Sequence, residues 1–250
     1  MTHRSLFAAG LVAAMAGPAS AAVVGIDSVS LSPAPTTDPL LVNATIDSIT
    51  LGGNTFSDLE SITSVDFPAN RERLWATDGT DPGSDSAAIV GLDYGTSVLN
   101  LQANTDLNFG RTLAANERVF LIKDGLANSS EANPDRLTLL ALAGDTVIGD
   151  YSINLDDSDY GATLPLGVTL QRESGASDLV DRDRVGVSFL VSDLAGTTGD
   201  LSTLTGFRVS ATGNEAGRYD LAAAGVVVPE PGAIALLGLG AACLLGRRRA

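Results

Sequence analysis

The chain has 250 residues, with 15 basic and 30 acidic side chains and a net charge of −15. A surface this acidic repels polyanions, so nucleic acid and anionic membrane surfaces are excluded as partners. The single histidine (His3) and the single cysteine (Cys243) lie in segments that we expect to be removed, which excludes disulfides, histidine-dependent catalysis and histidine-ligated metal sites from the remainder.

Residues 1–21 have the three parts of a secretory signal peptide. A basic start containing Arg4 precedes an apolar region from Leu6 to Met15. Small residues three positions and one position before the cut form an A-x-A pattern, which predicts cleavage by signal peptidase after Ala21, with Ala22 as the alternative. An uncleaved N-terminal helix is the competing interpretation, but the apolar region is too short for it. The protein is therefore expected to be exported.

Residues 22–225 are predicted to form one ectodomain. The expected mature region, Ala22 to Val228, is long enough to bury a core. It carries 11 basic and 29 acidic side chains, a net charge of −18. We expect this acidity to serve solubility, with binding of divalent cations or salt tolerance as alternatives.

Short apolar or alternating runs separated by turn-forming residues predict about twelve strands in this region. In chain order they are expected over Val23–Leu31, Leu41–Leu51, Ser61–Phe67, Ala87–Leu92, Ser97–Leu101, Val119–Lys123, Arg136–Ala143, Thr146–Leu155, Ala162–Gln171, Val185–Ser192, Leu204–Ala211 and Arg218–Val227. The clearest alternation places Val185, Val187 and Phe189 on one face, as a period of two residues requires.

One short helix is expected at Thr55–Glu60, and residues 32–39 are expected to form an extended N-terminal arm. The number of strands and the turns between them predict an all-β fold, a β-sandwich of jelly-roll type. A β-helix is the competing architecture, but the sequence has no fixed repeat period.

Aspartates gather in the loops between these strands. One Gly- and Pro-rich loop contains Asp78, Asp81 and Asp85, and another contains Asp156, Asp157 and Asp159. Oxygen-rich loops can hold Ca²⁺, so these six residues are candidate metal ligands and Ca²⁺ is the one cofactor considered. An EF-hand is rejected because Gly167 stands where its bidentate glutamate is needed. Solvated turns in an acidic protein are the alternative interpretation.

Trp75 is the candidate glycan contact because aromatic faces stack on sugars, with a partly buried core tryptophan as the alternative. Paired carboxylates could hydrolyse glycosides, but no spacing singles out one pair. Lys123 is the only lysine, so Ser-Lys chemistry has a single candidate. We predict that the domain is not an enzyme.

The last segment, residues 226–250, has three parts. A short motif, Val228, Pro229, Glu230, Pro231 and Gly232, is expected to be extended because its prolines fix φ and restrict the residues before them. The uncharged stretch 232–246 follows, roughly 22 Å long as a helix, which is short for a membrane span. The final cluster, Arg247, Arg248 and Arg249, is expected to stay in the cytoplasm. A plain membrane anchor and a buried helix with a basic end are the alternatives.

This order of motif, apolar stretch and terminal arginines closely resembles the PEP-CTERM sorting signal of Gram-negative bacteria and covers about a tenth of the chain. The resemblance implies recognition by exosortase, a membrane-embedded cysteine protease expected to act as a transpeptidase, and cleavage near Pro229-Glu230-Pro231. It implies a transient stay in the inner membrane and then release or attachment at the cell surface. Such proteins accompany exopolysaccharide and biofilm production, so a structural or adhesive role is expected. A carbohydrate-binding module, stabilised by Ca²⁺, is the alternative.

Overall fold

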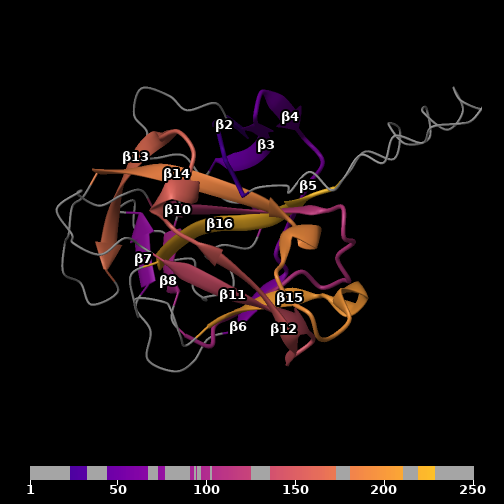
Figure 1. Ribbon diagram of the computed structural model, residues 1–250. Helices are drawn as coiled ribbons and strands as arrows, with labels where there is room; N and C mark the ends of the chain where they lie inside the picture. The colour runs from indigo at the N-terminus through magenta and orange to yellow at the C-terminus, as the bar shows by residue number, and fades with distance from the viewer. Residues whose placement is uncertain are drawn as a thin grey trace, which may run out of the picture.

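Strands make up most of the described protein, in three antiparallel sheets (Figure 1). A computed structural model describes residues 23–32, 44–66, 73–76, 91–92, 94, 97–101, 103–124, 136–172, 181–210 and 219–228. Within these ranges the only helical elements are the 3₁₀ turns η2 (Asp157–Asp159), η3 (Val191–Asp193) and η4 (Leu201–Thr203). The prediction of an all-β fold is confirmed.

The middle sheet has eight strands. Its order is β1 (Val24–Gly25), β14 (Asp181–Leu190), β10 (Arg118–Asp124), β16 (Tyr219–Val227), β8 (Ser97–Leu101), β7 (Arg73–Ala76) and β13 (Leu164–Arg172), while β5 (Leu59–Ser61) pairs with the far end of β16. β13 also pairs with β14, so six of these strands form a closed circuit of neighbours.

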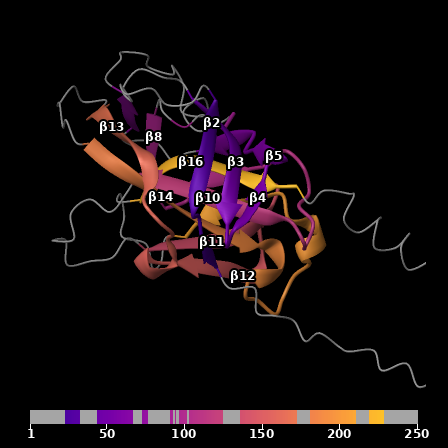
Figure 2. The same ribbon diagram turned by 90° about the horizontal axis from the view of Figure 1, so that it is seen from above.

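Smaller sheets cover the two faces of this middle sheet. One contains β12 (Thr146–Leu155), β11 (Leu137–Ala143), β15 (Gly206–Val209), β9 (Asp106–Asn108) and β6 (Ser64–Asp66), and the other contains β2 (Ser28–Ser32), β3 (Thr45–Leu51) and β4 (Asn54–Phe56). Figure 2 shows β2, β3 and β4 lying across β10, β14 and β16, with β11 and β12 on the opposite side.

The middle strands are buried on both faces, which explains their continuous apolar sequences. In β10, Val119 and Leu121 belong to the core shared with the five-stranded sheet, while Phe120 and Ile122 belong to the core shared with the three-stranded sheet. Every residue from 221 to 227 in β16 is also buried. A strand between two cores needs no polar face, so alternation disappears.

The architecture is more elaborate than the predicted jelly-roll sandwich. Two packed sheets would give one core, whereas the structure has three sheets and two clusters of buried side chains. The closing pair between β13 and β14 joins Leu164 to Arg184 and Thr169 to Asp181. This pairing depends on contacts between distant segments, which an apolar pattern does not specify.

The helix predicted at Thr55–Glu60 is wrong. Residues 54–56 form β4, which pairs with β3 through a tight turn at Gly52 and Gly53, whose φ angles are +55° and +80°. Residues 59–61 form β5, which pairs with β16. Pairing with the adjacent strand β3 and with the distant strand β16 overrides the local preference of this segment. The first predicted strand is also divided, into β1 and β2, and the expected N-terminal arm and most of the strand at 87–92 lie outside the described residues.

Candidate sorting junction

β16 leads directly into the predicted sorting motif. Its last residues, Gly225 to Val227, pair with β10 on one side and with β5 on the other. Val226 is fully buried and Val227 is 3% exposed. One residue further, the Val228 amide donates a hydrogen bond of 2.9 Å to the carbonyl oxygen of Asp58. The chain is thus held by the domain until the residue before Pro229.

The domain boundary drawn between residues 225 and 226 therefore divides a core strand. Val226 and Val227 fall within the expected sorting segment 226–250, but their side chains fill the two cores of the ectodomain. The fold extends to Val228, which both ends the domain and begins the motif.

Gly225 allows β5 and β10 to approach this part of β16 closely. A Cβ atom at this position would lie 2.5 Å from the carbonyl oxygen of Glu60 and 2.6 Å from Cζ of Phe120. Neither distance is compatible with a real side chain, so any larger residue would push the two neighbouring strands apart.

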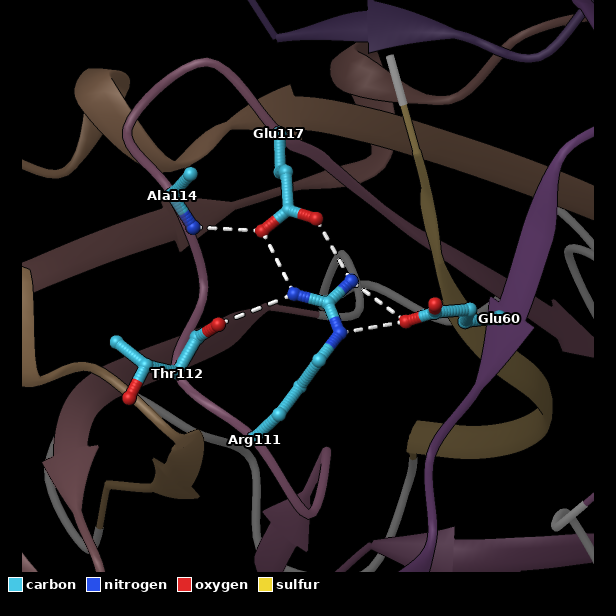
Figure 3. Close-up of polar contacts among 5 residues, drawn as sticks. All are labelled: Glu60, Arg111, Thr112, Ala114 and Glu117. Atoms are coloured by element: carbon cyan, nitrogen blue, oxygen red, sulfur yellow. Dashed lines mark hydrogen bonds and ion pairs between the residues drawn. The ribbon is translucent and has the colours of Figure 1, made fainter. Parts of the chain in front are cut away.

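Arg111 links β5 to the loop that precedes β10 (Figure 3). Its Nε donates to Glu60 Oε2 at 2.6 Å, and its Nη1 and Nη2 donate to the two carboxylate oxygens of Glu117 at 2.9 and 2.6 Å. Nη1 also donates to the Thr112 carbonyl, and the Ala114 amide donates to Glu117 Oε2. One guanidinium thus joins a half-exposed carboxylate on β5 to a buried one beside β10.

The electrostatics of this network favour the charged forms of both partners. Burial would raise the pKa of Glu117, but the hydrogen bonds from Arg111 and the Ala114 amide, together with the Arg111 charge, outweigh it and hold that pKa below its usual value. The hydrogen bond to Glu117 is the main reason that the pKa of Arg111 is raised. The network therefore holds β5 to the loop that precedes β10.

Arg118, opposite Val227, adds a second cation at this end of β16. Its Nη1 donates to Ser188 Oγ at 3.3 Å. Burial lowers its pKa, and the nearby charge of Asp193 acts in the opposite direction. The residues that surround the exit of the chain are therefore charged, whereas those of β16 are apolar.

The predicted Ca²⁺ ligands fall into two groups. Asp78, Asp81 and Asp85 lie outside the described residues, whereas Asp156, Asp157 and Asp159 lie at the turn η2. Asp156 Oδ1 accepts hydrogen bonds from the amide and hydroxyl of Ser158, which lower the pKa of Asp156. Asp159 Oδ2 accepts from the Asp156 amide at 2.8 Å. These two carboxylates cap the turn, and the described residues contain no group of three or more acidic, histidine or cysteine side chains that could hold a metal.

Trp75, the predicted glycan contact, lies on β7 between two neighbouring strands. It pairs with Gln171 of β13 and with Ser97 of β8. Contact with a glycan stays a prediction for Trp75.

A shallow groove that the sequence did not predict lies at the end of the β11–β12 hairpin. It has a volume of about 260 Å³ and is lined by Arg136, Thr138, Asn154, Leu155 and Asp156. Thr138 Oγ1 donates to Asn154 Oδ1 at 2.7 Å, which fixes the orientation of that amide. The groove depends on strand register, because Thr138 and Asn154 are 16 residues apart but directly opposite one another.

Lys123 and Arg184 are fully buried, on the two faces of the middle sheet. The ammonium of Lys123 lies 4.9 Å from the centre of the Tyr160 ring, and the Arg184 guanidinium lies 4.7 Å from that of Tyr94. Arg184 also donates to the Tyr94 carbonyl. Such cation–π contacts stabilise charge away from water. In the structure Lys123 is therefore a packing residue.

The predicted membrane segment, residues 232–246, and the arginines at 247–249 lie outside the described residues, as do Pro229 to Gly232. Within the described part of the chain, no helix has the length and apolar character needed to cross a bilayer.

Comparison with known proteins addresses the C-terminal segment. The model of the PEP-CTERM protein-sorting motif matches residues 227–249. No curated protein and no solved structure matches the chain. The motif indicates a secreted protein that is targeted to exosortase, with export to the cell surface or the extracellular space. The chain carries the PEP-CTERM sorting motif that its sequence predicted, and the match begins at Val227, the last residue of β16.

Proposed function

We propose that this protein has a structural or adhesive role in the exopolysaccharide layer of the cell surface or biofilm matrix. The observation that carries the proposal is the sorting motif at residues 227–249, joined without a linker to a β domain. The net charge of −18 supports a role in a hydrated layer, since it keeps the domain soluble. The lack of histidine between the two processed ends supports a role without catalysis or a resident cofactor.

In this proposal the apolar stretch 232–246 halts in the inner membrane, with the arginines at 247–249 on the cytoplasmic side. Exosortase then cleaves near Pro229-Glu230-Pro231, and the domain is released or attached at the surface. The test is to replace these three residues together by alanine in a host with a cognate exosortase. The variant should accumulate in the inner membrane at full length. Normal surface release of the variant would contradict the proposal.

The proposed role itself needs a separate measurement. A deletion strain should form a biofilm of lower mechanical strength, and the wild-type gene should restore it. A chain with the triple-alanine motif should not restore it, because the domain would not reach the matrix. Full restoration by that variant would show that the function lies elsewhere.

A carbohydrate-binding module is the second candidate, favoured by the groove at Arg136 and Asn154. Amide, guanidinium and carboxylate groups side by side are suited to the hydroxyl groups of a sugar. A glycan array with residues 22–228 tests this, with Asn154→Ala and Trp75→Phe as separate variants. Binding that is lost only with Asn154→Ala would place the sugar at the groove, and binding lost only with Trp75→Phe would place it near β7. A Ca²⁺ titration of the melting temperature tests the proposed metal stabilisation in the same fragment.

A further inference from the structure

The chain leaves the folded domain at a fixed point. β16 is paired on both sides up to Val227, and the Val228 amide is bonded to the Asp58 carbonyl. Pro229 is the next residue, so the prolines of the sorting motif follow directly on a residue that the domain holds. Releasing more chain would require Gly225 to Val227 to unpair from two neighbours and two buried valines to enter water.

The length of the motif limits the distance between the domain and an enzyme active site that binds the motif. The three residues from Pro229 to Pro231 span at most about 10 Å when extended. Prolines favour that extended form. An active site that holds Glu230 must therefore approach the surface around Val228 within this distance and contact it.

That surface, the exit face, is charged. It consists of the side chains that adjoin the end of β16 or are linked to those that do and are not buried: Asp58, Glu60, Arg111, Arg118 and Asp193. Three are acidic and two are basic, and Arg111 is paired with Glu60, so the exposed Asp58 provides the excess negative charge. Anionic lipid head groups would be repelled by it, whereas a protein surface with basic side chains would be attracted.

We propose that the exit face is a docking surface for the exosortase that cleaves the motif, and that the enzyme meets it with a basic rim around its active site. This inference rests on the proposed processing by exosortase. The folded ectodomain then contributes to recognition, in addition to the residues of the motif. Asp58 is the most direct test residue because its side chain is exposed and its carbonyl oxygen, which any side chain retains, bonds to Val228.

The experiment follows precursor conversion by pulse–chase in cells that contain the full-length chain and exosortase. Asp58→Lys reverses one charge on the exit face. Asp47→Lys is the matched control, because Asp47 is also exposed and lies on β3, far from the exit face. Its position follows from its neighbour Ile46, whose amide donates to the Leu92 carbonyl. Leu92 is two residues from Tyr94, which contacts Arg184. Arg184 lies opposite Asp124, the last residue of β10, whereas Val227 lies opposite Arg118, the first. The two test positions are thus at opposite ends of the domain.

Asp58→Lys should slow conversion about three- to tenfold relative to Asp47→Lys, because charges at the rim of an interface act mainly on association. A ten-residue Gly/Ser spacer between Val228 and Pro229, with an r.m.s. length of about 17 Å, should abolish the difference between the two variants. Resistance to added protease should be equal in both, which separates docking from folding.

Equal conversion of the two variants without the spacer would overturn the docking proposal. Faster conversion of Asp58→Lys would also overturn it, because a positive charge there favours contact with anionic lipid instead. Failure of the proposed function is distinguishable, since it appears as normal conversion when all three motif residues are alanine.

Discussion

β16 and β12 are strands of nine and ten residues, but they occupy opposite situations. β16 lies between two strands and two cores, and its residues from 221 to 227 are all buried. β12 is at the edge of the five-stranded sheet, with exposed residues such as Asn154 between buried ones such as Ile153 and Leu155. The strand that continues into the sorting tail is therefore the one whose loss would destabilise the domain more.

The edge strand is protected in a different way. The backbone of Ser152 exchanges two hydrogen bonds of 2.9 Å with Ala195, and the carboxylate of Asp150 accepts from the amides of Thr197 and Thr198 at 2.7 Å. The loop that follows η3 thus covers part of the free edge of β12, which would otherwise be available for pairing with another chain. β16 therefore depends on packing, and β12 depends on a polar loop.

The largest expected effect is on the packing of β16. Val226→Asp places a carboxylate in a fully buried position without a partner, and we expect a loss of about 4 kcal/mol or more in the free energy of unfolding. Urea denaturation of residues 22–228 measures it. Asn154→Asp on β12 is the control and should change stability by less than about 0.5 kcal/mol. Equal losses would remove the distinction between the strands.

The next effect concerns the network that joins β5 to the loop before β10. Arg111→Met leaves the buried carboxylate of Glu117 without its main partner, and we expect a loss of about 2 kcal/mol, moderated because Arg111 is one-third exposed. The double variant with Glu117→Gln should recover part of this loss, because no buried charge remains. A double variant as unstable as both single changes added together would show that the pair is not coupled.

The same network predicts a dependence on pH. The pKa of Glu117 is lower in the folded protein than its ordinary value of 4.5, so its charged form stabilises the fold above that value and this contribution is lost as the pH falls. The stability difference between wild type and Arg111→Met should therefore be greatest above about pH 5 and shrink toward pH 3. A difference that grows in acid would contradict this assignment.

A smaller effect is expected at Gly225. Alanine there would meet Glu60 and Phe120, and the required shift of both strands should cost about 1–3 kcal/mol. Gly144→Asn is the matched control, because this position has open space and a φ of +58° that asparagine tolerates. The melting temperatures of both variants show whether close packing at Gly225, or the loss of a glycine in itself, lowers the stability.

The smallest effect belongs to the protected edge. Asp150→Asn should weaken the hydrogen bonds that attach the loop after η3 to β12. Hydrogen exchange at the Thr197 and Thr198 amides should then accelerate, while the β16 amides remain protected. Asp145→Asn in the exposed β11–β12 turn should leave both sets unchanged. Unaltered exchange in Asp150→Asn would mean that the backbone bonds of Ser152 alone hold the loop.

The sequence was sufficient to predict those elements whose structure is determined by one local pattern. The alternation at Val185, Val187 and Phe189 predicted β14, and the continuous apolar run at 119–122 predicted β10. The C-terminal motif could be identified from the sequence because recognition by an enzyme requires a fixed order of residues. That order does not depend on the structure of the domain before it.

The remainder depends on contacts between distant residues. β9 escaped prediction because Asp106 and Asn108 are polar. Its pairing with β15 and β6, and the ion pair of Asp106 with Arg208, 102 residues away, join it to distant segments. β5 has three residues and exists because β16 pairs with it. The Arg111 network joins a loop to residues 51 positions earlier and six positions later, and no spacing rule connects them.

The burial of Lys123 has a practical consequence for chemistry on this protein. It is the only lysine in the chain, and none of its surface is accessible to solvent. Aldehyde fixatives and succinimidyl ester dyes react with accessible amines, so the folded ectodomain presents them with no side-chain target. Proteomic crosslinking through lysine would miss this protein even where it is abundant, and reagents directed at carboxylates are the appropriate choice because the chain has 30 acidic residues.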